Sequence, residues 1–469
     1  MNFILIKKNF LDISKIFVLS LTIFFWDLRI VGFDSRLLII TLFIFIFFEP
    51  SVIFSQKFKK NFIISILVFL PIAVHYYANL INDNKFILKI PKELIYIYLC
   101  VFIIFINIEL ILKRFRLIIF FFITLFIIST IIFFFKNGYL VYDELMDEFI
   151  AREVSPVPNS PFFIYKFNLS CSYFGGWHGY TRFFFSENSH LAMMSVPIII
   201  YYLIGNHLSK FSLLEKIFIL AFSIIAVINY TATFLLGIIF SLLALFISNR
   251  KYFVKKKLIF TALLFFLSGS VIFIDKDCSY KIFTFQNAIT AELGLTKWKG
   301  QSEEIINPKT GKKIEEKMLG LSGAVAMNSY NIALTTIKNR PLGWGVNRYE
   351  EAYGEYVLDR NQRINRQDPN YINKYNLRQY HKMQFVYNLN TRDGSNNLAK
   401  IITEFGIFSI LIFIYFIYFS FSNKPSFAEK SFLIPLVLTQ LLRGAGYFNG
   451  GFLIIIIIML AITFLKKDD

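Results

Sequence analysis

The sequence predicts an all-α, polytopic inner-membrane protein, a helical bundle of about 12 transmembrane helices with two long loops on one side. Of its 469 residues, 56% are hydrophobic and only 17% are charged, whereas soluble domains carry about 25% charged residues. The apolar residues gather into segments of roughly 20, the length that crosses a bilayer. Lys and Arg gather in alternate connections between these segments, as in membrane proteins.

The apolar segments place the predicted spans at 15–32, 37–54, 62–81, 93–112, 117–135, 188–205, 214–229, 231–248, 258–275, 397–419, 431–446 and 449–465. The first span is not a cleavable signal, because no A-x-A site follows it and Asp27 and Arg29 lead directly into the second span. The spans divide the chain into the parts 1–135, 136–186, 187–275, 276–396 and 397–469. We call 136–186 the first long loop and 276–396 the second long loop.

The basic residues predict the orientation of these spans. Twenty Lys and Arg residues lie in the short connections on the side of both termini, and six lie in the short connections on the other side. Both termini are therefore expected in the cytoplasm, and both long loops on the outer face. Any chemistry outside the membrane is expected on that outer face. Within the second long loop, 296–317 is expected to be a mobile excursion, and 328–353 an amphipathic helix followed by a glycine-rich turn.

Several kinds of site find no support in the sequence. The five His residues show no metal-binding spacing, and no nucleotide-binding glycine loop is present. A nucleic-acid partner is not expected, because membrane topology accounts for most of the net charge of +18. No metal or cofactor is therefore expected. Cys171 and Cys278 lie in the two long loops, where a disulfide could join them, but spacing alone does not establish one.

Arginines at the outer ends of the spans are the first candidates for binding. The residues concerned are Arg182, Arg340, Arg348, Arg392 and Arg443. The planar guanidinium binds phosphate oxygens with two hydrogen bonds and stays charged at any working pH. Such donors would suit a substrate that carries a diphosphate at the lipid interface, and they would stabilise the charge that develops as it leaves. Alternatively, the arginines extend to lipid head groups, as they commonly do at span ends.

Candidate acid–base residues lie at the start of the sixth and tenth spans. Glu187 and His190 share one helical face, so Glu187 could act as a general base on a hydroxyl group while His190 orients it. Alternatively, Ser186 caps this helix, Glu187 favours its positive end, and His190 is hydrogen-bonded within the bundle. Glu404 in the tenth span could be the buried partner of an arginine or a reactive carboxylate.

Three motifs resemble a known family. "TRFFFSENSHLA" (181–192), "NRPLGWGVNRY" (339–349) and "GSNNLAKIITEFG" (394–406) are similar, in that order, to motifs of the bacterial O-antigen polymerase and ligase superfamily. Its members are metal-independent membrane glycosyltransferases of the GT-C kind, acting on undecaprenyl-diphosphate-linked sugars outside the inner membrane. Arg182 matches an arginine implicated in diphosphate binding in that family. Gly343 and Gly345 match its P-x-G-x-G turn.

Departures from the family pattern favour its polymerase branch. Ligases carry His before the Asn of the third motif, whereas Ser395 precedes Asn396 in this chain; Glu404 and Gly406 fit the pattern. Many members also carry a Ser-Arg element early in the eighth span, where "TATFLL" (231–236) has no Arg. The missing phosphate contact could come from Arg340, Arg348 or Arg443.

The resemblance implies an enzyme that polymerises lipid-linked repeat units of O-antigen or a related polysaccharide at the periplasmic face. The candidate catalytic residues are Arg182, Glu187, His190, Asp393 and Glu404, with Glu187 the first choice of base. The candidate substrate-binding residues are Asn188, Arg340, Gly343, Gly345, Arg348, Asn396 and Arg443. The expected partners are undecaprenyl-diphosphate-linked oligosaccharide and membrane lipids, with a chain-length regulator as a further candidate.

A non-catalytic assembly or export subunit stays open at this stage, as do two further alternatives. One is an O-antigen ligase, which transfers the finished glycan to lipid A core. The other is a lipid-linked oligosaccharide flippase, for which short loops would be typical, so the 121 residues of the second long loop argue against it. Aromatic residues such as Trp177 and Trp344 could stack on sugar rings or anchor the chain at the interface.

Overall fold

The computed structural model describes the greater part of the helices and a smaller part of the long loops. The described residues are 11–21, 40–44, 55–82, 92–137, 164–165, 182–183, 188–205, 211–228, 231–253, 255–274, 282–283, 286–287, 290, 295–297, 302–306, 313–317, 321–361, 394, 396–444, 446 and 452–466. Among these residues the fold is helical, as predicted, apart from two small antiparallel sheets.

The helices correspond closely to most of the predicted spans. In chain order they are α4 (Gln56–Asn82), α5 (Lys92–Asn137), α6 (Asn188–Ile200) with the π-helix η2 (Tyr201–Gly205), α7 (Leu213–Ile228), α8 (Ala232–Ser248), η4 (Arg250–Tyr252), α9 (Lys255–Ile274), α11 (Leu321–Asn339), α12 (Tyr349–Asn361), α15 (Asn397–Phe405), η5 (Gly406–Phe408), α16 (Ser409–Phe421), α17 (Phe427–Leu442) and α18 (Phe452–Leu465). Helical turns also occupy 11–21 and 40–44. Helix α8 begins after its N-cap Thr231, in agreement with the start of the predicted span 231–248; residues 229–230 of the predicted tight turn lie outside the described residues.

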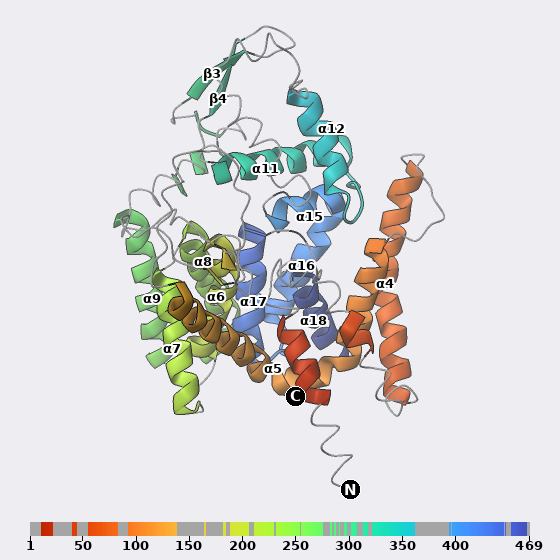
Figure 1. Cartoon of the computed structure of the whole chain (residues 1–469). Helices are drawn as coiled ribbons and strands as arrows, with labels where there is room; N and C mark the ends of the chain where they lie inside the picture. The colour runs from red at the N-terminus through yellow and green to blue at the C-terminus, as the bar shows by residue number, and fades with distance from the viewer. Residues whose placement is uncertain are drawn as a thin grey trace.

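Three of the described helical stretches are long and apolar enough to cross a membrane. They are Gln56–Leu80, Leu94–Ile128 and Asn397–Phe421, and shorter apolar helices run over Leu191–Gly205, Ala232–Ser248, Thr261–Ser270 and Phe452–Leu465. These helices indicate a membrane protein. The number of spans and their orientation stay predictions. Figure 1 shows the helices of the second long loop, α11 and α12, gathered at one end of the bundle, which we call the loop end.

Helix α5 differs from the prediction of two spans, 93–112 and 117–135, with a turn at 113–116. The structure has one helix of 46 residues over Lys92–Asn137. The sequence at 113–116 is Lys-Arg-Phe-Arg, which contains neither Gly nor Pro, and Lys and Arg are good helix formers, so a cluster of charges does not end the helix. At 1.5 Å per residue the helix is about 69 Å long, about twice the hydrocarbon thickness.

The first half of α5 packs on α4 and its second half on α7, with α18 also in contact. Aromatic rings make both contacts: Phe58 of α4 lies edge-on to Phe102, and Phe222 of α7 lies edge-on to Phe126, with centroids 5.7 and 5.1 Å apart. Figure 1 shows α5 passing from the side of α4 to the side of α7. It therefore connects the two sides of the bundle.

The centre of the bundle is formed by α6, α8 and α17, which pack on one another. Gly237 lets α8 approach α17 closely, because a Cβ there would lie 2.6 Å from a methyl group of Thr439. Pro197 has no N–H, so the carbonyl of Met193 lacks its usual partner within α6. The hydroxyl of Thr439 lies 3.3 Å from that carbonyl and 2.9 Å from the carbonyl of Pro435 in its own helix, so α17 offers the Met193 carbonyl a donor that its own helix shares.

At the end of the bundle opposite the loop end, basic residues join helices through an ion pair and hydrogen bonds. Arg116 of α5 forms an ion pair with Glu215 of α7, with 3.1 Å between Nε and Oε1. The buried ammonium of Lys430 donates to the carbonyl of Ser420 and to Oδ1 of Asn249, both at 2.9 Å, and so joins the C-terminal ends of α16 and α8. Some of the basic residues that predict the orientation of the spans therefore also stabilise contacts between helices.

The second long loop contains more regular structure than predicted. Its segment 296–317, expected to be a mobile excursion, includes strands β3 (Ser302–Ile306) and β4 (Lys313–Lys317), which pair with Ile305 opposite Ile314. The first long loop contains β1 (Ile164–Tyr165) and β2 (Arg182–Phe183), with Tyr165 opposite Arg182. Cys171 and Cys278 lie outside the described residues.

The continuity of α5 predicts how it responds to proline. Replacement of the exposed Arg114 by Pro removes one helical hydrogen bond and should cost about 3 kcal/mol of stability, because a proline inside a helix also collides with the preceding turn. A lower thermal midpoint in detergent micelles, measured with Arg114→Ala as the control, would show this loss. Equal midpoints for the two variants would instead indicate a turn at 113–116.

Candidate functional site

Two of the three motifs pack directly on each other at the loop end of the bundle. The turn 340–348, which joins α11 to α12, lies against the break between α15 and α16 at Gly406. In a continuous helix, Ile407 would donate to the carbonyl of Thr403. Here Trp344 donates to Thr403 over 3.1 Å, and Ile407 donates to Pro341 over 2.8 Å. We call this backbone exchange the turn–helix junction.

The junction depends on glycines that face each other. Gly343 and Gly406 have φ values of 80° and 54°, which favour glycine. A Cβ on Gly343 would collide with the backbone of Glu404, and a Cβ on Gly406 would collide with the backbone of Pro341. Gly345, with φ of 97°, donates to the carbonyl of Glu404 over 2.9 Å. Gly343 and Gly345, expected to bind substrate, thus shape the turn and bring it onto the helix.

The side chain of Glu404 strengthens the same junction. Its carboxylate accepts hydrogen bonds from the backbone N–H groups of Asn347, at 2.8 Å, and Tyr349, at 3.1 Å. Lys400, one turn earlier on α15, forms an ion pair with it at 3.0 Å, and the side chains of Lys400 and Glu404 are 1% and 0% exposed. Glu404 is therefore the buried partner of a cation, which is a lysine and not the arginine expected. Its i,i+4 spacing from Lys400 could have revealed this partner.

The two arginines of the second motif have different surroundings. Arg348 is 4% exposed, and its guanidinium binds both carboxylate oxygens of Glu351, at 2.8 and 2.6 Å, and the carbonyl of Trp344 at 2.9 Å. Arg340 is half-buried, and its guanidinium lies over the ring of Trp344, 3.9 Å from the centroid. The fork of Arg348 thus holds the turn to α12, whereas Arg340 lies nearer the surface.

Asparagines at the start of α15 join it to the connection between α17 and α18. Asn396, expected to bind substrate, caps α15: its Oδ1 accepts from the N–H of Ala399 at 2.7 Å. Asn397 is fully buried, and its Oδ1 accepts from the N–H of Gly446 at 3.0 Å. Arg443 lies in this connection, at the C-cap of α17. Sequence reasoning did not identify Asn397.

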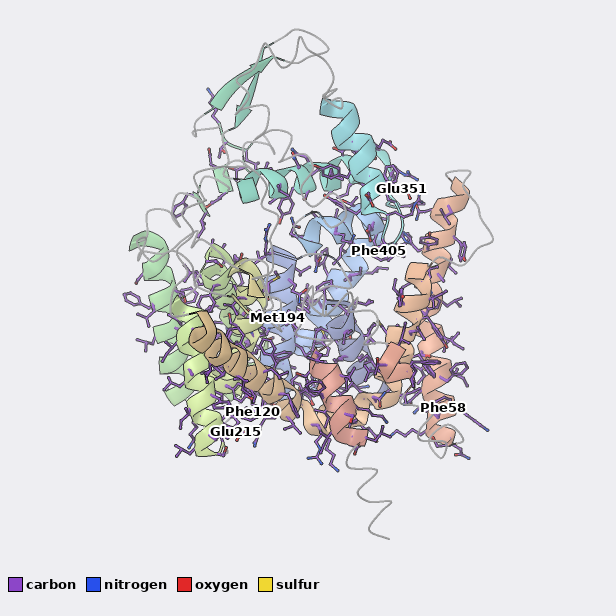
Figure 2. All side chains as sticks on the ribbon, viewed as in Figure 1. Phe58, Phe120, Met194, Glu215, Glu351 and Phe405 are labelled. Atoms are coloured by element: carbon purple, nitrogen blue, oxygen red, sulfur yellow. The ribbon has the colours of Figure 1, made fainter. Side chains whose placement is uncertain are left out.

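A histidine of α4 completes the junction. His75 donates from Nε2 to the carbonyl of Leu342 at 2.9 Å, and its ring stacks on Phe405 and meets Phe408 edge-on. Figure 2 shows the labelled Glu351 on α12 and the labelled Phe405 below it, at the loop end of the bundle. His75 lies 267 positions from Leu342, so no local pattern could have predicted this contact.

The first motif is described in less detail. The backbone of Arg182 lies in β2, and β2 contacts α5. Asn188 and His190 lie in the first turn of α6. Glu187 and Asp393 lie outside the described residues, as do the side chains of Arg182, Asn188 and His190. Their roles as base, diphosphate ligand and sugar ligands stay predictions.

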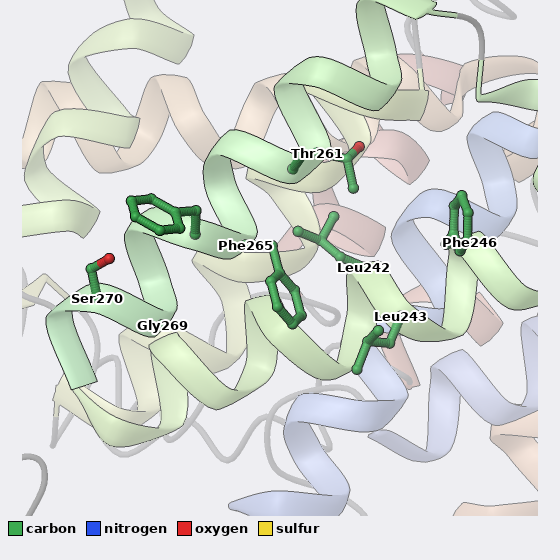
Figure 3. A pocket seen from close by; sticks show the side chains of 9 residues that line it. Leu242, Leu243, Phe246, Thr261, Phe265, Gly269 and Ser270 are labelled. Atoms are coloured by element: carbon green, nitrogen blue, oxygen red, sulfur yellow. The ribbon is translucent and has the colours of Figure 1, made fainter. Parts of the chain in front are cut away.

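Other groups near the junction offer little acid–base or metal chemistry. Burial raises the pKa of Tyr353 to about 12 and also raises the pKa of Tyr356, so both phenols are neutral near neutral pH. Among the described residues, no cluster of three His, Cys, Asp or Glu side chains could hold a metal ion. A separate apolar hollow between α8 and α9, lined by residues such as Leu242, Phe246 and Phe265, contains no charged side chain (Figure 3).

No protein-family model, curated protein or solved structure matches this chain. The resemblance to the O-antigen polymerase and ligase superfamily therefore rests on the three motifs. Two of those motifs form the turn–helix junction, where the side chains in contact belong to residues from α4, α11, α12, α15 and the turn itself.

The buried ion pair of Lys400 and Glu404 predicts that substitutions of these two residues have coupled effects on the free energy of unfolding. Lys400→Met and Glu404→Gln should each lower the free energy of unfolding by about 3–5 kcal/mol, because each leaves the partner buried without its counter-charge. The double variant should lose less than the sum of the two. A double-mutant cycle on unfolding in detergent measures this difference. Strictly additive losses would mean that the two side chains do not act as a pair.

The glycines predict a second, steric effect. Gly343→Ala should destabilise the protein by about 1–3 kcal/mol or more, because it adds a Cβ at positive φ against the backbone of Glu404. Gly269→Ala in α9 is the control: nothing lies within 4 Å of its Cβ, so the change should be neutral or stabilising. Thermal midpoints of the two purified variants provide the comparison. A midpoint of Gly343→Ala at or above that of the parent protein would contradict the close contact.

Proposed function

We propose that this protein polymerises oligosaccharide repeat units carried on undecaprenyl diphosphate into O-antigen or a related surface polysaccharide, as a metal-independent glycosyltransferase at the periplasmic face of the bacterial inner membrane. The observation that carries the proposal is the turn–helix junction, in which two motifs of the resemblance meet where a candidate membrane helix is interrupted. Interrupted membrane helices commonly occur at substrate sites, because irregular backbone inside a membrane must be hydrogen-bonded by neighbouring segments.

In this proposal the diphosphate is bound by Arg182 and Arg340. Arg348 is the weaker candidate, because its guanidinium is already bound to Glu351 and to the carbonyl of Trp344. Arg340 is half-buried at the margin of the junction, where its guanidinium lies 3.9 Å from the centroid of the buried ring of Trp344. Many family members have a Ser-Arg element where this chain has "TATFLL" (231–236), which contains no Arg. Phosphate binding by Arg340 would replace the contact that this element could make.

The reaction is a displacement at an anomeric carbon. A hydroxyl oxygen of one lipid-linked unit bonds to the anomeric carbon of another unit's first sugar, and the bond from that carbon to the diphosphate oxygen breaks. The hydroxyl proton passes to a general base, and undecaprenyl diphosphate leaves as the anion that the arginines stabilise. Glu187 is the proposed base, with Asp393 next. Glu404 is better suited to positioning the turn, since its carboxylate accepts from two N–H groups and Lys400.

Deletion of the gene tests the reaction class. If the protein is the polymerase, cells should display lipid A core that carries single repeat units, visible as one band on a gel of surface polysaccharide. Complete loss of attached sugar would favour a ligase or a flippase. An unchanged ladder would contradict the proposal and both alternatives.

The two arginines of the second motif supply a matched test of the site. Arg340→Ala should lower polymerisation by about 10²-fold at an unchanged protein level, because it removes one donor to the leaving diphosphate. Arg348→Ala should instead lower the thermal midpoint and the amount of protein, since it removes a buried side chain that binds both Glu351 and the carbonyl of Trp344. Chain-length profiles, normalised to membrane protein level, distinguish the two effects. The role of Arg340 would be wrong if its variant made chains of normal length.

Arg182→Ala tests the other proposed diphosphate ligand in the same assay. It should abolish long chains while the protein is still expressed. Normal chain length in this variant would show that Arg182 is not part of the site. The gene deletion would then decide the reaction class by itself.

A further inference from the structure

The tip of the turn–helix junction lies beside two candidate membrane helices, at a level inside their apolar segments. The tip consists of Pro341 and Leu342. The carbonyl of Leu342 accepts from His75, which precedes the end of the apolar stretch Gln56–Leu80 by five residues, about 7.5 Å of helix. The carbonyl of Pro341 accepts from Ile407, which lies within the apolar stretch Asn397–Phe421.

Both carbonyls of this tip, and the N–H group that follows it, are hydrogen-bonded within the protein. Pro341 has no N–H group, and the carbonyls of Pro341 and Leu342 are both hydrogen-bonded within the protein. Gly343, the next residue, donates its N–H to the carbonyl of Arg340 at 2.8 Å. Irregular backbone is tolerated at membrane depth where its polar groups are satisfied in this way.

The side chains at the tip nevertheless leave a large apolar surface uncovered. Leu342 is 46% exposed, and its neighbours Ile407 and Phe408 are 55% and 43% exposed. This surface continues along both adjoining helices, over exposed apolar residues of α4 (Leu67, Leu70 and Val74) and of α16 (Ile410, Leu411 and Ile414). A continuous exposed apolar surface of this kind marks contact with a membrane or another protein.

We infer that Pro341 and Leu342 are inserted into the hydrocarbon layer of the adjacent leaflet, where lipid acyl chains cover Leu342, Ile407 and Phe408. Acyl chains are favoured over a protein partner because the surface is continuous with the exposed sides of two helices that are themselves apolar enough to span a bilayer. The charge pattern agrees with this occupant. Lys338 and Arg340 precede the tip, as basic residues do at the level of lipid phosphates.

This insertion has a consequence for Arg340. Since Arg340 is one residue from an inserted Pro341, its guanidinium is held at the depth of head-group phosphates and does not extend into the water beyond them. The inference requires only that α4 and the stretch Asn397–Phe421 cross a membrane, and it does not rest on the polymerase proposal.

Spin labels measure the depth of the tip directly. Single cysteines replace Leu342, Val74 or Glu355 in the full-length protein, with Cys100, Cys171 and Cys278 changed to Ser, and each variant is labelled in phospholipid nanodiscs. Val74 is 59% exposed on α4 and serves as the lipid reference. Glu355 is exposed on α12 and serves as the water reference. The measured quantity is the ratio of collision rates with oxygen, which enters lipid, and with a charged nickel chelate, which does not.

The ratio at position 342 should equal that at position 74 and exceed that at position 355 several-fold. A ratio at 342 close to that at 355 would mean that the tip lies in water and would overturn the inference. Low collision rates with both reagents at 342 would mean that another protein, or a second copy of this chain, covers the tip, and would also overturn it. The same measurement with Phe408→Cys provides a second position should the Leu342 variant fail to fold.

Discussion

The exchange of backbone hydrogen bonds at Gly406 is the constraint on which the loop end of this protein depends. A helix that is interrupted leaves carbonyl and N–H groups that must find partners, above all inside a membrane. The turn 340–348 supplies those partners: Trp344 donates to Thr403, and Pro341 accepts from Ile407. Because these contacts join backbone to backbone, they also require the glycines that let the two segments approach.

Buried charges then hold the exchanged segments in place. Lys400 and Glu404 pair within α15, and Glu404 also accepts from the first N–H groups after the turn. Arg348 pairs with Glu351 and so holds the turn to α12. A buried pair such as Lys400 and Glu404 adds little net stability but is costly to break, so it favours one arrangement of the turn over others. Among the arginines of this motif, Arg340 lies nearer the surface and is the one that the proposed function uses.

Sequence reasoning predicted the elements that hydrophobicity determines. The helices α6 to α9 and α15 to α18 lie close to their predicted spans, because each of them corresponds to a long run of apolar residues. It was wrong about the turn at 113–116, since charges mark a membrane boundary without breaking a helix. It did not identify Asn397 or His75, because their partners are set by tertiary contacts, and it overlooked the i,i+4 spacing of Lys400 and Glu404. The glycines were selected for substrate binding from a motif, whereas their backbone angles give them a steric role.

The turn–helix junction also bears on how far the rest of the second long loop can change. Among the described residues, the backbone exchange joins Pro341, Trp344 and Gly345 to Thr403, Glu404 and Ile407, and no residue of α12 contributes a bond to it. Each doubling of a connecting loop costs only about 0.6 kcal/mol in closure entropy, so the intervening chain can lengthen, shorten or alter its composition at small thermodynamic cost. The rest of the loop could therefore change in length and sequence while the turn–helix junction stays the same.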